Sequence, residues 1–226
     1  MKVLLLFETT GLAAQEFERL GIETICVDIV QPALAPLRTS LCWDVLEKEQ
    51  ELIEIAKTCV LVFGMPPCTD LTSTGAKHFR AKAAVDPDFQ IKAVHVVRSV
   101  ERIGVAAGVP WAIENPFGVI TSFWRKWNFR FEPWEYGGYL PEDDRHPLWP
   151  KYIAPRDAYP KRTGLWTGNK FTLPKKLPIT PERGWARQVR LLGGKGAFTK
   201  TVRSASPRGF FRALAISLVD KKESSN

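Results

Sequence analysis

One cysteine in the sequence stands where a reactive thiol is expected. Residues 60–63, Val-Leu-Val-Phe, predict a buried strand, and the glycine after them permits a sharp turn. Pro66 and Pro67 then fix two successive φ angles, so Cys68 stands at the end of a stiff segment. The loop continues with hydroxyl groups and one carboxylate as far as Gly75. A thiol at the carboxyl end of a strand, on a rigid polar loop, is placed for chemistry rather than for packing.

The other three cysteines have a simpler interpretation. Cys26, Cys42 and Cys59 each lie in or beside an apolar run, as expected of small buried hydrophobic residues. The four cysteines include no Cys-x-x-Cys pair and are irregularly spaced, which argues against a zinc site or a disulfide framework. We therefore expect no metal and a reducing, cytoplasmic setting. We also expect no signal peptide and no membrane association, because no apolar run approaches the ~20 residues of a membrane span.

A carboxylate follows a second predicted strand. Residues 110–113 are predicted to be a strand that leads directly into Glu114, Asn115 and Pro116. Cys68 and Glu114 would each follow a parallel strand, so we expect both to face one crevice. Taken alone, Glu114 has the plainer interpretations of a helix cap or an arginine partner.

The elements that would position these residues alternate between strands and helices. Asp86 and Pro87 predict the start of a long helix that ends near Gly108, with apolar residues at every third position from Ile91 to Ile103. The aromatic run 117–139 is expected to be a packing layer, with a base-stacking platform as the alternative, and the last six residues a disordered tail. The alternation predicts an α/β fold, with a doubly wound, mostly parallel sheet and ligands above the carboxyl ends of its strands. Strands are expected at 2–7, 23–27, 40–42, 60–63, 110–113 and 165–167, and further helices at 12–20, 45–57 and 206–219.

Charge is distributed unevenly along the chain. The net charge is +8, yet residues 1–150 contain 15 Lys and Arg against 20 Asp and Glu. Residues 151–212 contain 15 Lys and Arg against 2 Asp and Glu. A merely solvated basic face is one interpretation, but so strong an excess favours a polyanionic partner, and nucleic acid above all.

The residues around Cys68 and Glu114 resemble the cytosine-C5 DNA methyltransferase family. The loop GMPPCTDLTSTG keeps the Pro-Pro-Cys of the family, a hydrophobic residue three positions after the cysteine and a glycine seven positions after it. Glu114-Asn115 matches the Glu-Asn pair of the family, although Pro116 replaces the usual valine. The resemblance covers about residues 1–168 and, more weakly, the terminal helix.

This resemblance implies S-adenosylmethionine as the methyl donor and DNA, most simply double-stranded, as the partner of a monomer or weak oligomer. The implied catalytic residues are Cys68 as the nucleophile toward C6, Glu114 at the base edge, and Arg162 at the base carbonyl or a phosphate. The implied cofactor-binding residues are Phe7, Gly11, Asp28, Asp44 and Pro66. The implied substrate-binding residues are Pro67, Ser73, Gly75, Asn115 and Lys195. Asp28 and Asp44 have a turn-forming role as their plainer interpretation. Phe7 and Gly11 match the Phe-x-x-x-Gly of the family's cofactor loop, but the further glycines of that loop are missing.

The resemblance also implies a division of roles: a catalytic and cofactor-binding part at 1–168, a basic DNA-contacting segment at 169–205, and a terminal helix at 206–221 that packs back. The basic segment is too short for an independent recognition domain. We therefore expect a short recognition sequence and strong salt dependence. Other possibilities are C5 modification of RNA or a free nucleotide, transfer of a group other than methyl, and a catalytically silent nucleic-acid-binding protein. A thiol hydrolase is more remote, because no histidine is evidently placed to serve Cys68.

Overall fold

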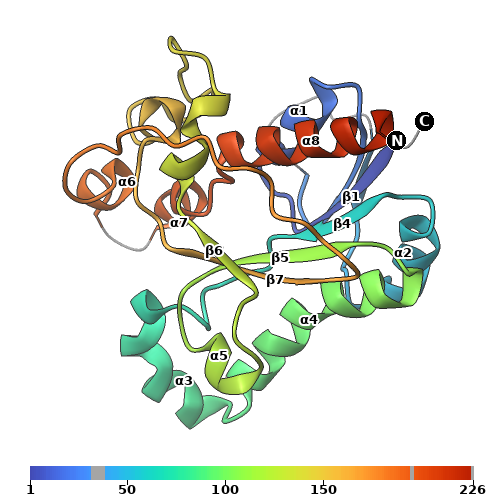
Figure 1. The fold of residues 1–226 in the computed structure, drawn as a ribbon. Helices are drawn as coiled ribbons and strands as arrows, with labels where there is room; N and C mark the ends of the chain where they lie inside the picture. Colours follow the sequence, from blue (N-terminus) through green and yellow to red (C-terminus); the bar gives the residue numbers. More distant parts are fainter. Residues whose placement is uncertain (32–38, 194–195, 225–226) are drawn as a thin grey trace. The chain divides into compact units, whose positions relative to one another are not determined.

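The computed structural model describes residues 1–31, 39–193 and 196–224, and a seven-stranded sheet organises it (Figure 1). The strand order is β3-β2-β1-β4-β5-β7-β6. The five strands from β3 to β5 run parallel, whereas β7 is antiparallel to β5. This confirms the expected α/β class with a mostly parallel, Rossmann-like sheet. The strands are β1 (Lys2–Leu6), β2 (Glu23–Asp28), β3 (Thr39–Cys42), β4 (Leu61–Gly64), β5 (Trp111–Pro116), β6 (Phe129–Phe131) and β7 (Thr163–Gly168).

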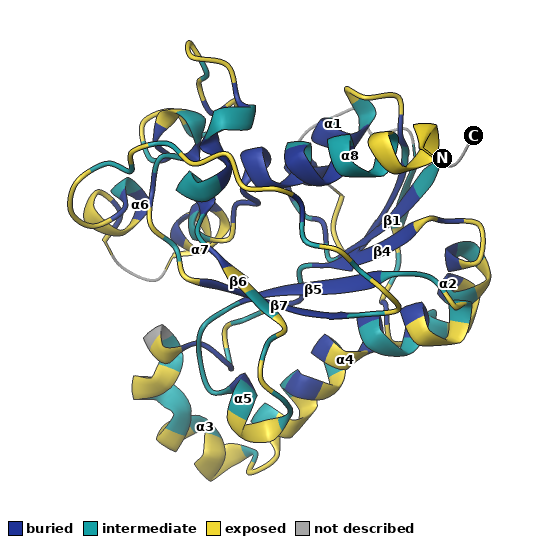
Figure 2. Cartoon of the chain, in the orientation of Figure 1, coloured by how far each residue is buried: buried dark blue, intermediate teal, exposed yellow. Residues whose placement is uncertain are grey.

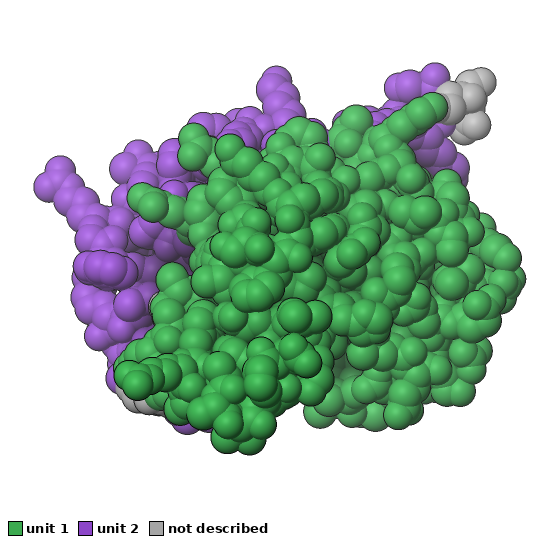
Figure 3. Space-filling model, turned by 90° about the horizontal axis from the view of Figure 1, so that it is seen from below, with its two compact units in different colours: residues 1–11, 23–130, 162–172 green, residues 12–22, 131–161, 173–226 purple. Residues whose placement is uncertain are grey.

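The chain divides into two compact units (Figure 3). The first comprises residues 1–11, 23–130 and 162–172, and the second comprises residues 12–22, 131–161 and 173–226. Our three-part division of the chain concerned roles, and it stays a prediction. The α-helices are α1 (Leu12–Glu18), α2 (Glu49–Ala56), α3 (Phe79–Val85), α4 (Phe89–Ala107), α5 (Ile120–Phe123), α6 (Arg187–Arg190), α7 (Ala197–Arg203) and α8 (Arg208–Glu223), and the 3₁₀ helices are η1 (Ser73–His78), η2 (Pro133–Tyr139) and η3 (Pro155–Asp157).

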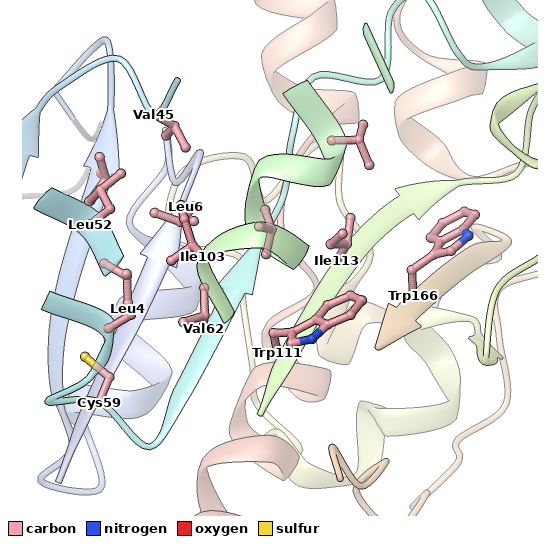
Figure 4. Close-up of a cluster of buried hydrophobic side chains, with 14 of the residues drawn as sticks. Leu4, Leu6, Val45, Leu52, Cys59, Val62, Ile103, Trp111, Ile113 and Trp166 are labelled. Atoms are coloured by element: carbon pink, nitrogen blue, oxygen red, sulfur yellow. The ribbon is translucent and has the colours of Figure 1, made fainter. Parts of the chain in front are cut away.

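The core of the first unit lies between the sheet and the helices α2 and α4 (Figure 4). Alternate residues of the strands supply it, among them Leu4 and Leu6 of β1 and Trp111 and Ile113 of β5, all nearly inaccessible to solvent (Figure 2). Gly64 allows α4 to approach β4 closely, because a Cβ at this position would overlap the side chain of Val100. Trp124 and Trp127 pack against the same core, which confirms the packing interpretation for this part of the aromatic run.

The long helix α4 differs from its prediction at the N-terminal end. It begins at Phe89, and Asp86 does not cap it but follows α3 and accepts the Asp88 N–H at 3.1 Å. Ile91 is 58% exposed, although the residues from Val94 to Ile103 on the same spacing are buried. A spacing of three falls short of the 3.6-residue turn, so successive residues drift around the helix and the first one leaves the buried face.

The second unit is built around α8, which packs on α1 and η2. Phe210 stacks on Phe131 with ring centroids 4.3 Å apart, and Phe211 meets Phe17 edge-on at 6.2 Å. α8 extends through Glu223, so the first three of the six residues expected to be disordered are helical, and residues 225–226 lie outside the described part of the chain. Lysines at the C-terminal end of a helix favour this extension, because they interact well with its dipole.

Three other details differ from expectation. The helix α3 was not predicted, and none of its residues is buried, so its sequence has no apolar face to recognise. α2 begins only at Glu49, because residues 45–48 form a turn. Leu20, expected on the buried face of the first helix, lies beyond the end of α1 and is 40% exposed. Across residues 1–31, 39–193 and 196–224, no helix combines the length and hydropathy that a membrane span requires.

Candidate active site

The register of β4 and β5 brings the cysteine loop and Glu114 to the same end of the sheet, where the parallel strands have their carboxyl ends. Val62 pairs with Trp111 and Gly64 with Ile113, in parallel orientation. The segment that leaves β4 toward Cys68 therefore starts beside Glu114, which is the next residue of β5. Ile113 faces the core under α4, so Glu114 points to the opposite face of the sheet.

Three contacts fasten the cysteine loop to the end of β5. The side-chain amide of Asn115 donates from Nδ2 to the carbonyl oxygen of Pro66 at 3.3 Å. The Val119 N–H donates to the Leu71 carbonyl at 2.7 Å, and Thr72 forms an isolated antiparallel bridge with Gly118. Residues 65–72 and 115–119 are therefore held as one piece, which we call the β4–β5 edge.

Bonds within the loop also fix the backbone at Cys68. The carbonyl oxygen of Cys68 accepts the N–H groups of Leu71 and Thr72 at 2.9 and 3.0 Å. Asp70 forms an ion pair with Lys82. These bonds hold the cysteine in a tight turn rather than in an open loop.

The predicted residues of the loop differ in exposure. Cys68 is half-buried, Pro66 is buried, and Pro67 and Ser73 are exposed. The fold itself explains why position 75 is a glycine, because a Cβ at this position would overlap the carbonyl oxygen of Thr69. The substrate contacts expected of Pro67, Ser73 and Gly75 stay predictions.

Cys68 also differs in exposure from the other cysteines. Cys26 and Cys59 are buried as expected, and burial raises the pKa of the Cys59 thiol. The expectation for Cys42 was wrong: it is exposed at the end of the edge strand β3, where its Sγ donates to the Ile29 carbonyl at 3.1 Å. An edge strand leaves its last residue uncovered on one side, so an apolar sequence context does not guarantee burial there.

Arg162 joins the same edge through the antiparallel strand β7. Pro116 pairs with Thr163, and the Phe117 N–H donates to the Arg162 carbonyl at 3.4 Å. Arg162 is exposed and Glu114 is 8% exposed. The three predicted catalytic residues are thus all attached to the edge formed by β4, β5 and β7.

The loop after β1 contains a functional candidate that the sequence reasoning missed. Glu8 is 1% exposed, and its Oε1 accepts the N–H groups of Thr10 and Gly11 at 2.9 and 2.8 Å. Phe7 and Gly11 both have positive φ, at 61° and 77°, so the loop is tightly wound around this carboxylate. The sequence signal that could have revealed Glu8 is a carboxylate followed by Thr-Thr-Gly, because acidic side chains commonly accept backbone N–H groups two or three residues ahead.

Asp28 and Asp44 follow the neighbouring strands β2 and β3. Asp28 is 8% exposed, and its Oδ1 accepts the Val30 N–H at 3.1 Å. Burial raises the pKa of Asp28, although hydrogen bonds from the backbone N–H groups of Ile29 and Val30 act to lower it. Asp44 is exposed, and its Oδ1 accepts the Leu46 N–H at 2.8 Å, which is the turn-forming role. Lys195 lies outside the described residues.

The chemistry of these carboxylates limits the ligands that the edge formed by β1, β2 and β3 can hold. Glu8, Asp28 and Asp44 are acceptors that suit a cationic ligand bearing hydroxyl and amino groups. Glu8 already occupies the N–H groups of Thr10 and Gly11, which a phosphate-binding loop would present to its ligand. A ligand with cationic groups and hydroxyls suits such a set of acceptors better than one that binds through phosphates. Among the residues described, no group of three or more His, Cys, Asp or Glu is arranged to hold a metal ion.

Comparison with known proteins gives no further guidance. The chain matches none of the models of known protein families, and no curated protein matches it.

Proposed function

We propose that the protein transfers a methyl group from S-adenosylmethionine to C5 of cytosine in DNA. The observation that carries the proposal is the β4–β5 edge, which fixes a half-buried thiol and a nearly buried carboxylate at one edge of the sheet. A half-buried thiol can meet a substrate, whereas a sealed one cannot.

In this proposal Cys68 adds to the base as a thiolate. Its sulfur forms a bond to C6 of cytosine, and the electrons of the C5–C6 double bond then make C5 nucleophilic. Glu114 holds N3 and the exocyclic amine and favours protonation of N3 as the ring accepts the thiolate. Assistance of this general-acid type is typically worth ~10²–10⁴-fold in rate.

The remaining steps restore the aromatic ring. The bound cofactor would supply an electrophilic methyl group: the bond from C5 to the methyl carbon forms as the bond from that carbon to the sulfonium sulfur breaks, and the demethylated cofactor leaves as a neutral thioether. A base or water then takes the C5 proton, the C5–C6 double bond re-forms, and Cys68 leaves as a thiolate. Arg162 would orient the base carbonyl or an adjacent phosphate, and the target base would leave the duplex stack at a cost of a few kcal/mol.

The same residues account for cofactor choice in this proposal. The loop around Glu8 and the carboxylate of Asp28 would hold the cationic and hydroxyl-bearing parts of S-adenosylmethionine, and Pro66 would close the site beside them. These carboxylates support the proposal because they would repel a ligand that binds through phosphates.

Nucleoside mass spectrometry of DNA incubated with the protein and S-adenosylmethionine tests the reaction. We expect 5-methylcytosine with the wild-type chain and none with Cys68→Ser. DNA containing 5-fluorocytosine should trap a covalent adduct, because the fluorine cannot leave as a proton does. The matched control is Cys42→Ser, which should form product and adduct like the wild type.

Parallel reactions with RNA and with free cytidine nucleotides decide the substrate class. Product in those reactions but not with DNA would contradict the proposal and favour the RNA or nucleotide alternative. The absence of both product and adduct, in a chain that still binds DNA, would favour a silent binding protein.

A further inference from the structure

Internal bonds hold the fold of residues 182–193 and 196–203 of the second unit, which we call the α6–α7 segment. Arg203 donates from Nε to the Gln188 carbonyl at 3.1 Å and from Nη2 to the Leu192 carbonyl at 2.7 Å. Glu182 forms a two-point ion pair with Arg187, with one of its hydrogen bonds measuring 2.9 Å. These bonds occupy two of the basic side chains and fix the backbone of the part described.

A tryptophan of this segment is directed to solvent. Trp185 is 77% exposed, and each of the seven other tryptophans of the chain is buried or half-buried. Apolar side chains near it in sequence are also exposed: Val189, Leu191 and Phe198. A large aromatic surface left in water is typical of a binding site rather than of a packing element.

The charge around Trp185 is positive and unbalanced. Arg183, Arg190 and Lys200 are exposed, and within the described part of the chain they form no ion pair. Glu182 is the single acidic residue between Asp157 and Asp220, and Arg187 already neutralises it. The described part of this segment therefore carries three exposed cations and an exposed aromatic ring.

We infer that Trp185 stacks on a base of the bound nucleic acid while Arg183, Arg190 and Lys200 contact its phosphates. Nucleic acid is the partner that presents negative charge and aromatic faces at close intervals, so it matches both features. An accessible base face requires an unstacked base, and we therefore expect a preference for single-stranded DNA or for a duplex opened at one position. The inference deepens the proposed function and rests on it for the choice of DNA, but it concerns binding and requires no methyl transfer.

Fluorescence anisotropy with the full chain and labelled DNA, in the absence of cofactor, tests the inference. Trp185→Ala should weaken binding of single-stranded DNA at least about fivefold, and Trp185→Phe, which keeps a ring, by about twofold or less. The matched control is Phe123→Ala, an exposed aromatic residue of the first unit at 44% exposure, which should bind like the wild type. All these variants should keep the melting temperature of the wild type, because both substituted side chains are exposed.

Two further arms separate stacking from charge. Heparin is a polyanion without bases, so Trp185→Ala should bind it like the wild type. Arg190→Gln should lower the slope of log affinity against log salt by about 1 for DNA, and Trp185→Ala should leave that slope unchanged.

Three results would overturn the inference. They are equal DNA binding by Trp185→Ala and the wild type, equal losses on DNA and heparin, and a Trp185-dependent binding to phosphatidylserine vesicles with no such dependence on DNA. If the wild-type chain transfers no methyl group while Trp185→Ala still weakens DNA binding, the proposed reaction is refuted and this inference stands.

Discussion

Polar groups serve different purposes in the β4–β5 edge of the first unit and in a buried charge network of the second unit. At the edge they fasten a loop, and in the network charged side chains pair with one another inside the fold. In the network, Arg208 donates from Nη1 and Nη2 to the two carboxylate oxygens of Asp144 at 2.8 and 2.6 Å, and each side chain is 6% exposed. The Gly209 N–H donates to Asp157 Oδ2 at 2.9 Å. At the β4–β5 edge, in contrast, the fastening bonds come mostly from the backbone, and Cys68 is only half-buried.

The buried network also shifts the pKa of its titratable groups. Burial raises the pKa of Asp157 to about 6 despite the nearby charge of Arg208. Burial, together with the charge of Arg208, lowers the pKa of His146 to about 3. Structural ion-pair networks shift pKa values as active sites do, so a shifted pKa alone does not mark an active site.

The sharpest test of the contrast separates activity from stability at Cys68. Cys68→Ser should abolish methyl transfer, a loss of at least about 10³-fold, because a serine hydroxyl is not ionised at neutral pH. Its free energy of unfolding should change by less than ~0.5 kcal/mol, since the residue is half-buried and the substitution exchanges a single atom. Tritium transfer and urea unfolding measure the two effects, and a stable variant with wild-type rate would remove the nucleophile from the proposal.

A substitution in the buried charge network, unlike Cys68→Ser, should lower the stability of the fold strongly. Arg208→Met should lower the free energy of unfolding by about 3–5 kcal/mol, because it leaves Asp144 and Asp157 buried without their counter-charge. Urea unfolding measures this loss, and Arg183→Met, at an exposed position, should stay within about 0.5 kcal/mol of the wild type. A small effect of Arg208→Met would mean that the network contributes little to the fold.

The pH dependence of stability should reveal His146 and Asp157 separately. His146 has a folded pKa of about 3, below its ordinary 6.5, so the unfolded chain takes up the proton first and stability falls as the pH drops from 6.5 toward 3. Asp157 has a folded pKa of about 6, above its ordinary 3.8, so its contribution to stability rises as the pH drops through that window. Each slope is at most about 1.4 kcal/mol per pH unit.

Two variants distinguish these contributions in urea unfolding from neutral to acid pH. His146→Gln should flatten the loss of stability on acidification, and Asp157→Asn should steepen it. If both variants keep the wild-type slope, neither group titrates as its burial requires.

The smallest expected effect concerns the amide that fastens the loop. Asn115→Leu should lower the free energy of unfolding by about 1–2 kcal/mol, because the Pro66 carbonyl loses its donor. Methyl transfer should slow by about tenfold as the loop loosens. Asn169→Ala removes amide bonds to the Gly104 and Val109 carbonyls of the same unit and should lower stability without a change in rate. Equal rates for both variants would show that the amide does not position the loop.

Much of the fold could be predicted, and the reason is physical. The parallel strands β1, β2 and β4 are buried along most of their length, so they appear as apolar runs, and the run of β2 ends in the polar residue Asp28. The exposed helix α3 could not be predicted, because a helix without a buried face carries no periodic signal. The end of α8 was missed because charged residues at a helix terminus look like a solvated tail.

The candidate site was predictable to a similar extent. Cys68 and Glu114 could be assigned to one edge, because each follows a predicted parallel strand. Arg162 could not, because it precedes β7 and reaches this edge only through the antiparallel direction of that strand, which the sequence analysis did not predict. The role of Glu8 could not be found from the Phe-x-x-x-Gly pattern, since it depends on a turn that brings two N–H groups to one carboxylate. The amide bond from Asn115 to Pro66 links residues far apart in sequence, and only the register of the sheet reveals it.

The glycine at position 118 has a consequence for motion. A Cβ there would overlap the Leu71 carbonyl oxygen, so the two backbones touch with no side chain between them. Neither loop can shift without displacing the other, and any opening that carries the sulfur away must carry the segment after Pro116 with it. A substrate would thus meet a preorganised surface, and little conformational entropy would be lost on binding. An attempt to exchange one loop for another sequence must exchange its neighbour as well.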